Sequence, residues 1–280
     1  MNSFNRNVLV IDLLRKEADL KNFSDFGQYI GGIGLGVNLY SYYKEYDPVI
    51  FSIGPLNGYF PFASKTSVIL NSEDGIEDIY LGGSLSTRIR FSGLDSIVLL
   101  GSSKAPIFLD INDGVVSFYG PEVDSKQLGL PGKRSSLSYE KGRFVLDEYF
   151  QAPDNFLEKK LYNKNFKGMV ITGTKAFEVS NFEKYSELYK KVLEKSSELS
   201  ISRSDKPSCA NCPMGCDFSQ TGELGGNILV HCMVGCSYAA SVYLDVGTVF
   251  SCLNVLGHDY THEDIENAPK LISELLETLK

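Results

Sequence analysis

Ile107-Phe-Leu-Asp-Ile-Asn112-Asp113-Gly114-Val-Val-Ser-Phe118 is the stretch that decides the fold of the first part of this chain. An Asp-Gly pair between two apolar runs is the strongest short-range signal for a β-hairpin. Short runs of the same kind, bounded by Gly, Pro or Asn, indicate further strands at Val8–Ile11, Val49–Ile53, Ser67–Leu70, Ile97–Leu100 and Gly168–Thr172. Residues 1–177 are therefore predicted to form a β-rich, β-sandwich-like domain.

The pattern changes after Lys175. Asn181 is a suitable N-cap, and apolar residues three and four positions apart predict an amphipathic helix from there to about Leu199. A second such pattern spans Glu263–Lys280. Residues 178–280 should form a smaller, mostly helical segment, so the predicted fold class is α+β. One more helix is expected earlier, from about Asp25 to Tyr43, interrupted by its glycines.

Composition and charge argue against some classes of binding partner. The 280 residues carry a net charge of −8, and 43% of them are hydrophobic, as in an ordinary protein with a core. The basic residues form no block, which argues against nucleic acid and anionic membranes as partners. The N-terminus lacks the pattern of a secretion signal, and the longest apolar runs are too short to span a bilayer. A cytoplasmic location is expected.

All six cysteines lie between residues 209 and 252. Cys209-Ala-Asn-Cys212-Pro-Met-Gly-Cys216 places three thiols in one short loop, with Pro and Gly at its bends. In a reducing compartment clustered cysteines indicate metal or redox ligands, and three thiolates on one loop suit an iron–sulfur cluster. Two alternatives stay open. One is a zinc site completed by Cys232, Cys236 or His231, and the other is a set of reduced core cysteines.

Two glycine segments invite a ligand hypothesis. Gly31-Gly-Ile-Gly-Leu-Gly36 is unlike a dinucleotide fingerprint, because a helix rather than a strand is predicted before it. Leu81-Gly82-Gly83-Ser84 follows a turn-like acidic run, Ser72–Asp78. Paired glycines let a backbone approach a bulky ligand closely, although a plain turn between strands explains them equally well.

In order along the chain, five segments resemble motifs of the aldehyde:ferredoxin oxidoreductases; they are Tyr29–Gly36, Ser52–Gly58, Gly82–Asp95, Asn163–Gly173 and Cys209–Cys216. The resemblance implies a tungsten centre held by molybdopterin-type cofactors beside a 4Fe-4S cluster. Such an enzyme oxidises aldehydes and passes the electrons to ferredoxin.

The resemblance also implies roles for single residues. Lys65 stands where the family offers the pterin an Arg, and Tyr80 where it offers an Asn. Gly82 and Gly83 fall in the segment that passes under the pterin. A degraded form of a later pterin motif keeps Asn254, Gly257 and Asp259. The cluster would be bound by Cys209, Cys212 and Cys216, with Cys252 favoured over Cys236 and Cys232 as the fourth ligand.

Two functions follow. The first is an iron–sulfur oxidoreductase that needs a second chain to supply the family's missing half, with ferredoxin as acceptor and a homodimer possible. Because Lys65 and Tyr80 replace a forked donor and an amide, we expect the chain alone to be inactive. The second is a non-catalytic descendant acting as a binding or scaffold module, with zinc at the cysteines.

Overall fold

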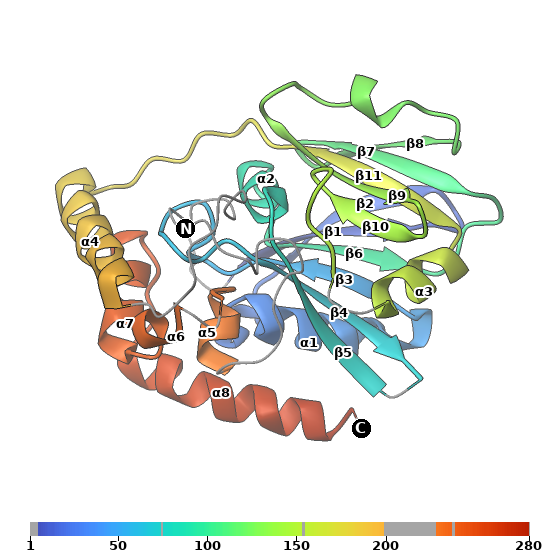
Figure 1. Cartoon of the computed structure of the whole chain (residues 1–280). Coiled ribbons are helices and arrows are strands. Elements are labelled where there is room, and N and C mark those ends of the chain that lie inside the picture. The colour runs from blue at the N-terminus through green and yellow to red at the C-terminus, as the bar shows by residue number, and fades with distance from the viewer. Residues whose placement is uncertain (1–4, 74, 153–154, 199–227, 237–238, 280) are drawn as a thin grey trace.

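The computed structural model describes residues 5–73, 75–152, 155–198, 228–236 and 239–279. Two β-sheets and a layer of helices build the molecule (Figure 1). The strands are β1 (Arg6–Asp12), β2 (Glu17–Phe23), β3 (Val49–Ser52), β4 (Thr66–Ser72), β5 (Gly75–Leu81), β6 (Ser96–Leu100), β7 (Ile107–Asn112), β8 (Val115–Tyr119), β9 (Arg134–Glu140), β10 (Arg143–Leu146) and β11 (Phe166–Thr172). The α-helices are α1 (Gly32–Tyr43), α2 (Leu85–Phe91), α3 (Phe156–Asn163), α4 (Phe182–Glu194), α5 (Ile228–Cys232), α6 (Ala240–Tyr243), α7 (Val246–Val255) and α8 (His262–Glu277).

Both sheets are mixed. The six-stranded sheet has the order β2-β1-β6-β3-β4-β5, in which only β1 and β6 are parallel neighbours. The five-stranded sheet has the order β10-β9-β11-β7-β8, in which only β11 and β7 run parallel. The hairpin predicted at Asn112-Asp113-Gly114 is confirmed, because β7 and β8 pair antiparallel from Asn112 and Val115 outward.

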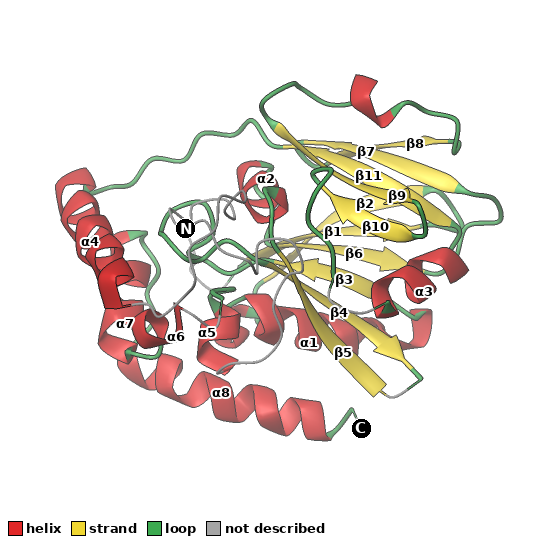
Figure 2. Ribbon diagram, in the orientation of Figure 1, coloured by secondary structure: helices red, strands yellow, loops and turns green. Residues whose placement is uncertain are grey.

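Strand alternation divides the core into two layers. Leu9, Phe51 and Val68 of the larger sheet pack against Leu109, Ile171 and other residues of the smaller one. Their neighbours Val8, Ile50 and Ile69 point to the other face, where they meet α1 and the C-terminal helices. Figure 2 shows α1 and the C-terminal helices on that side of the larger sheet, and the smaller sheet with α2 and α3 on the other. The α+β class predicted from the sequence is confirmed.

The N-terminal end of α4 was predicted correctly, since the Asn181 side chain accepts a hydrogen bond from the Lys184 backbone N–H at 2.9 Å. That α-helix ends at Glu194, followed by a 3-10 turn from Lys195 to Glu198, and Leu199 lies outside the described residues. The boundary between residues 177 and 178 stays a prediction. No helix among the described residues is long and apolar enough to cross a bilayer.

Two expectations were wrong. The helix expected from Asp25 begins at Gly32, because Ile30 adopts φ +60° and turns the chain after a 3-10 helix at Gly27–Tyr29. The run Ser72–Asp78 is no simple turn, because β5 begins at Gly75 and pairs with β4 along its whole length. Hydrogen bonds from Ser72 to Glu77 and from Ser67 to Asp78 let the sheet accept these acidic residues.

Candidate functional site

Three segments far apart in the sequence meet at the start of α1. The Gly32 N–H donates to the Ile53 carbonyl at 2.9 Å, and the Lys65 N–H donates to the Val234 carbonyl at 3.1 Å. A side chain on Gly32 would overlap the His231 carbonyl oxygen, and one on Gly54 would approach the Cys232 carbonyl oxygen to 2.6 Å. We call this contact of α1, the loop before β4 and the turn after α5 the glycine junction. Its glycines therefore serve backbone packing, and no strand directly precedes Gly32 as a dinucleotide site would require.

A buried polar group, the Tyr80 cluster, lies beside this junction. It consists of Ser67 on β4, Asp78 and Tyr80 on β5, and His231 on α5. The Tyr80 hydroxyl and the Ser67 hydroxyl both donate to the Asp78 carboxylate, the latter at 2.9 Å. The rings of Tyr80 and His231 meet edge to face with centroids 4.3 Å apart, and His231 Nδ1 lies 3.7 Å from Asp78 Oδ2. In the β4–β5 pairing Ser67 lies opposite Tyr80, so the side chains of Ser67, Tyr80 and Asp78 lie on the same face of the sheet.

Burial governs the protonation of this cluster. It raises the pKa of Tyr80 well above its ordinary value, and the neighbouring Asp78 charge raises it further. Burial also raises the pKa of Asp78, although hydrogen bonds from His231, Tyr80 and Ser67 oppose that shift. The Cys232 thiol next to His231 has its pKa raised to about 12 by burial. At neutral pH Tyr80 and Cys232 are therefore neutral.

Lys65 immediately precedes β4 and is 2% exposed, like Tyr80. Its backbone is fixed by Asn57, whose side-chain amide donates to the Lys65 carbonyl at 3.1 Å, while Asn57 Oδ1 accepts from the Gly54 N–H at 2.6 Å. The structure thus places Lys65 and Tyr80, two positions singled out from the sequence, at the same end of the β4–β5 pair.

Asn254, Gly257 and Asp259 lie at the end of α7, and all three are exposed. Gly257 has φ +84°, and the His258 N–H donates to the Leu253 carbonyl at 3.0 Å, a glycine-terminated helix end. The retained Gly therefore has a local structural explanation. Its predicted role toward a pterin stays a prediction.

His258, which the sequence analysis did not select, lies in the 254–259 segment within reach of the charges of Arg6, Arg90 and Asp95. Arg90 of α2 pairs with Asp95 at 3.0 Å, and Arg6 donates to the Tyr260 hydroxyl and to the Ile30 carbonyl, the latter at 2.8 Å. Burial and the charges of Arg6 and Arg90 lower the pKa of His258 to about 4. The sequence alone could not predict this environment of His258, because only the fold brings residues 6, 90 and 258 together.

We expect His258 to make stability depend on pH. Its pKa is lower in the folded chain than the ordinary value of about 6.5, so the unfolded chain binds more protons between pH 4 and 6.5. Stability is then lost as pH falls through this window, by up to about 2 kcal/mol from pH 7 to pH 5. Urea melts at both pH values should show a smaller loss for His258→Gln than for wild type. The exposed His262→Gln is the matched control, and equal losses in all three proteins would contradict the assignment.

Gly82 and Gly83 lie between β5 and α2. Gly83 has φ +77°, and a Cβ there would come within 2.9 Å of both Asp147 and Phe150. Asp147 in turn accepts hydrogen bonds from the Ser84 N–H at 2.7 Å and from the Ser84 hydroxyl at 2.8 Å. The paired glycines thus allow the chain to approach its own 147–150 loop, and their approach to a ligand stays a prediction.

The cysteine motif Cys209, Cys212 and Cys216 lies outside the described residues. Cys232 and Cys252 are fully buried in the helical layer, and Cys236 is partly exposed. Burial raises the pKa of Cys252 to about 12. Within the described ranges no group of three or more His, Cys, Asp or Glu side chains could hold a metal ion.

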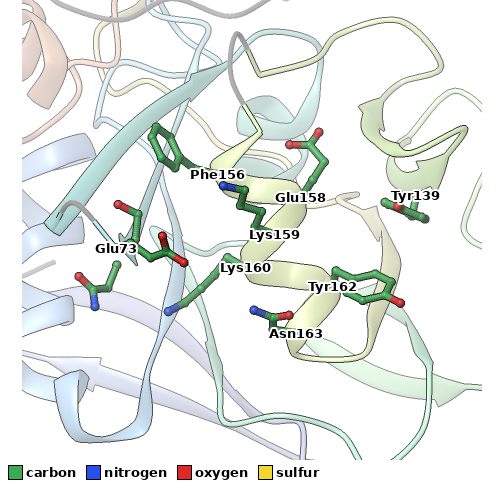
Figure 3. A pocket seen from close by; sticks show the side chains of 10 residues that line it. Glu73, Tyr139, Phe156, Glu158, Lys159, Lys160, Tyr162 and Asn163 are labelled. Atoms are coloured by element: carbon green, nitrogen blue, oxygen red, sulfur yellow. The ribbon is translucent and has the colours of Figure 1, made fainter.

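A cavity of about 570 Å³ beside α3 lies apart from all of these residues. Figure 3 shows Glu73, Lys159 and Lys160 on one side of α3 and Tyr139 and Tyr162 on the other. Lys160 is bound to Asp47, and Lys167 lies over both tyrosine rings. No residue predicted to bind a cofactor lines this cavity, so the Tyr80 cluster remains the candidate site.

The Tyr80 cluster also tests the fit of a pterin. A pterin would need an open polar cradle at Lys65 and Tyr80, but the Tyr80 ring packs on His231 and its hydroxyl is bound to Asp78. Both side chains are 2% exposed. The described residues around Tyr80 therefore do not fit a pterin. The donor chemistry of Cys209, Cys212 and Cys216 does fit an iron–sulfur cluster.

Comparison with known proteins agrees with the resemblance read from the sequence. Residues 8–127 match the aldehyde ferredoxin oxidoreductase N-terminal domain. The WOR-like subunit of an aliphatic sulfonate oxidoreductase from Pyrococcus furiosus is 28% identical over 131 residues, which are 41% of this chain and 21% of that subunit. The active site complex BamBC of benzoyl coenzyme A reductase, solved with 1,5-dienoyl-CoA, superposes with a TM-score of 0.63 at 16% identity. That match covers 98% of this chain and 61% of the other.

The match over residues 8–127 supports the predicted resemblance to that family, and the superposition on BamBC agrees with the fold. The chain spans about a fifth of the length of the curated relative that it matches. The reaction, the acceptor and the metals of this chain are therefore matters for proposal.

Proposed function

We infer that this chain, a divergent relative of the aldehyde ferredoxin oxidoreductases, carries a 4Fe-4S cluster on Cys209, Cys212 and Cys216 and transfers electrons within a multi-chain oxidoreductase. The observation that carries the proposal is the spacing of three cysteines within eight residues, with Pro213 and Gly215 at the bends. Thiolates so spaced bind three irons of one cubane, and the protein supplies the burial that tunes its potential.

The closed Tyr80 cluster favours a role in electron transfer over catalysis. A tungstopterin at the position of Lys65 and Tyr80 would have to displace the Tyr80 ring from His231 and its hydroxyl from Asp78. The pterin chemistry would then belong to a second chain, which also supplies the opposing wall of the substrate pocket. The relatives support this arrangement, because one is named as a subunit and the other as a complex.

Among the three described thiols we propose Cys236 as the fourth ligand, in place of the Cys252 expected from the sequence. Cys236 is the one that is partly exposed, whereas Cys232 and Cys252 would have to ionise inside an apolar layer. We expect Cys236→Ser to lose most of its iron and Cys252→Ser to keep it, measured as iron and sulfide per chain after anaerobic purification. Iron lost only in Cys252→Ser would restore the first choice. Full iron in both variants would move the fourth ligand to Cys232, a partner chain or a small thiol.

We expect the chain alone not to oxidise aldehydes. Catalysis needs the cofactor and the substrate held from both sides and shielded from water, and the described residues offer no open cradle for a pterin. The test is viologen reduction with acetaldehyde or a larger aldehyde under anaerobic conditions. Turnover by the chain alone with tungsten present would contradict the proposal, and turnover only after co-expression with a second chain would support it. Ferredoxin is the proposed acceptor, because the cluster is of the type that ferredoxins exchange electrons with.

A second candidate is a non-catalytic scaffold with zinc at the cysteines. The burial of Tyr80 and Lys65 favours this candidate, because the Tyr80 cluster connects the larger sheet to α5 without any cofactor. Zinc would bind tetrahedrally through four of the Cys or His side chains and leave the protein colourless. Metal content separates the two candidates.

A further inference from the structure

Five aromatic side chains surround a hollow of about 440 Å³ between α2 and α4, on elements that Figure 1 labels. Tyr59 comes from the loop before β4, Phe91 from the end of α2, Phe177 from the segment after β11, and Phe182 and Tyr185 from α4. We call it the aromatic hollow. Phe182 is 71% exposed and Phe177 39% exposed. Exposed phenylalanines gathered in a concave surface mark a binding site more often than scattered ones do.

The walls of the aromatic hollow are fixed. Phe177 lies nearly parallel to Phe91 at 6.1 Å and edge-on to Tyr59 at 6.3 Å between ring centroids. The Tyr185 hydroxyl donates to the Tyr59 carbonyl, which ties α4 to the loop before β4. The Lys175 N–H donates to the Phe91 carbonyl at 2.8 Å and holds the segment that carries Phe177. The rings of Tyr59, Phe91, Phe177 and Tyr185 are therefore arranged before any ligand arrives.

The charges around the aromatic hollow favour a cation. Glu178 supplies a carboxylate to the lining, and the described lining residues include no basic side chain. Two cations lie behind the walls. Arg90 is neutralised by Asp95 at 3.0 Å and donates to the Gly54 carbonyl at 2.9 Å, and the Lys175 ammonium lies against Gly93. Aromatic faces are the negative ends of the ring quadrupole, so five rings and one carboxylate attract positive charge.

Elsewhere in this chain a lysine side chain lies over a pair of tyrosine rings. Lys167 Nζ lies 4.9 Å from the centroid of the Tyr139 ring and 5.4 Å from that of Tyr162. No Lys or Arg of the described residues lies over the rings of the aromatic hollow in this way.

We propose that the aromatic hollow binds an organic cation, an alkylammonium or guanidinium group, through its aromatic rings and the Glu178 carboxylate. This site is separate from the proposed cluster and does not depend on it. The cation can come from a small molecule or from the side chain of a partner protein, and the two sources share the same chemistry.

The test compares choline with 3,3-dimethylbutan-1-ol, which has the same shape and no charge. Titrations of the full chain, followed by NMR or calorimetry at constant ionic strength, should show choline binding at least about tenfold more tightly than the neutral alcohol. Equal binding of the two would mean a purely apolar hollow and would overturn the proposal. Absence of binding by choline and also by an arginine-containing peptide would overturn it as well.

Variants locate the site. Phe182→Ala and Phe177→Ala remove exposed rings at little risk to the fold, and each should weaken choline binding at least about threefold. Glu178→Gln should weaken choline but not the alcohol. Tyr46→Ala removes a ring that is 62% exposed elsewhere and is the matched control. Choline binding that survives both Phe variants would place the cation elsewhere and contradict the assignment. Peptide binding without choline binding would support the cation site and identify a partner side chain as its source.

Discussion

Cys212→Ser is expected to purify with less than about a tenth of the iron of the wild-type chain, because the cluster loses the middle of three ligands on one loop. Serine is nearly the same size as cysteine but a poor ligand for iron, so the change removes the ligand with little change of shape. The measurement is iron and acid-labile sulfide per chain after anaerobic purification, together with absorbance at about 400 nm.

The matched control for this variant is Asn211→Ser, which places the same side chain one residue away in the same loop. Asn211→Ser should keep its iron. Wild-type iron in Cys212→Ser would remove the cluster from this loop, and iron lost from both variants would mean that the loop is merely sensitive to substitution.

Gly32→Ala is expected to lower the free energy of unfolding by about 4 kcal/mol or more. Its Cβ would overlap the His231 carbonyl oxygen and come within 2.7 Å of a methyl group of Val234, and φ is +50°. Neither neighbour can retreat easily, because the turn after α5 is held by hydrogen bonds from Val234 to His231 at 3.1 Å and from Gly235 to Val230 at 3.0 Å. Relief would need α5 to move away from α1.

Gly101→Ala is the matched control, because Gly101 has φ +62° but no atom within 4 Å of the place that a Cβ would occupy. Its cost should be about 1–2 kcal/mol, from the left-handed backbone alone. The difference between the two variants, measured by urea unfolding, isolates the contact at the glycine junction. Equal costs would contradict it, while failure of Gly32→Ala alone to accumulate as folded protein would agree with it.

Local patterns predicted the fold well where one residue type decides the geometry. Asp113-Gly114 placed the β7–β8 hairpin, and Asn181 placed the start of α4. Local patterns failed where contacts between distant segments determine the structure. β5 was hidden by Glu77 and Asp78, which the sheet accepts only because Ser72 and Ser67 donate to them. The start of α1 was misplaced because the left-handed turn at Ile30 has no signature in the sequence.

The candidate site divides in the same way. Lys65 and Tyr80 could be selected by family resemblance, and the fold places both at one end of the β4–β5 pair. His231 was considered only as a zinc ligand, and its contacts with Tyr80 and Asp78 require α5 to dock on α1, far along the chain from β5. Neither periodicity nor spacing carries information about such a contact.

Metal analysis of the wild-type chain, purified without oxygen, tests the central proposal most directly. We expect a brown protein with about four iron and four sulfide per chain and with no tungsten or pterin. A colourless protein with one zinc per chain, or one without any bound metal, would contradict the iron–sulfur assignment. Stoichiometric tungsten in the isolated chain would instead contradict the conclusion that the Tyr80 cluster excludes a pterin.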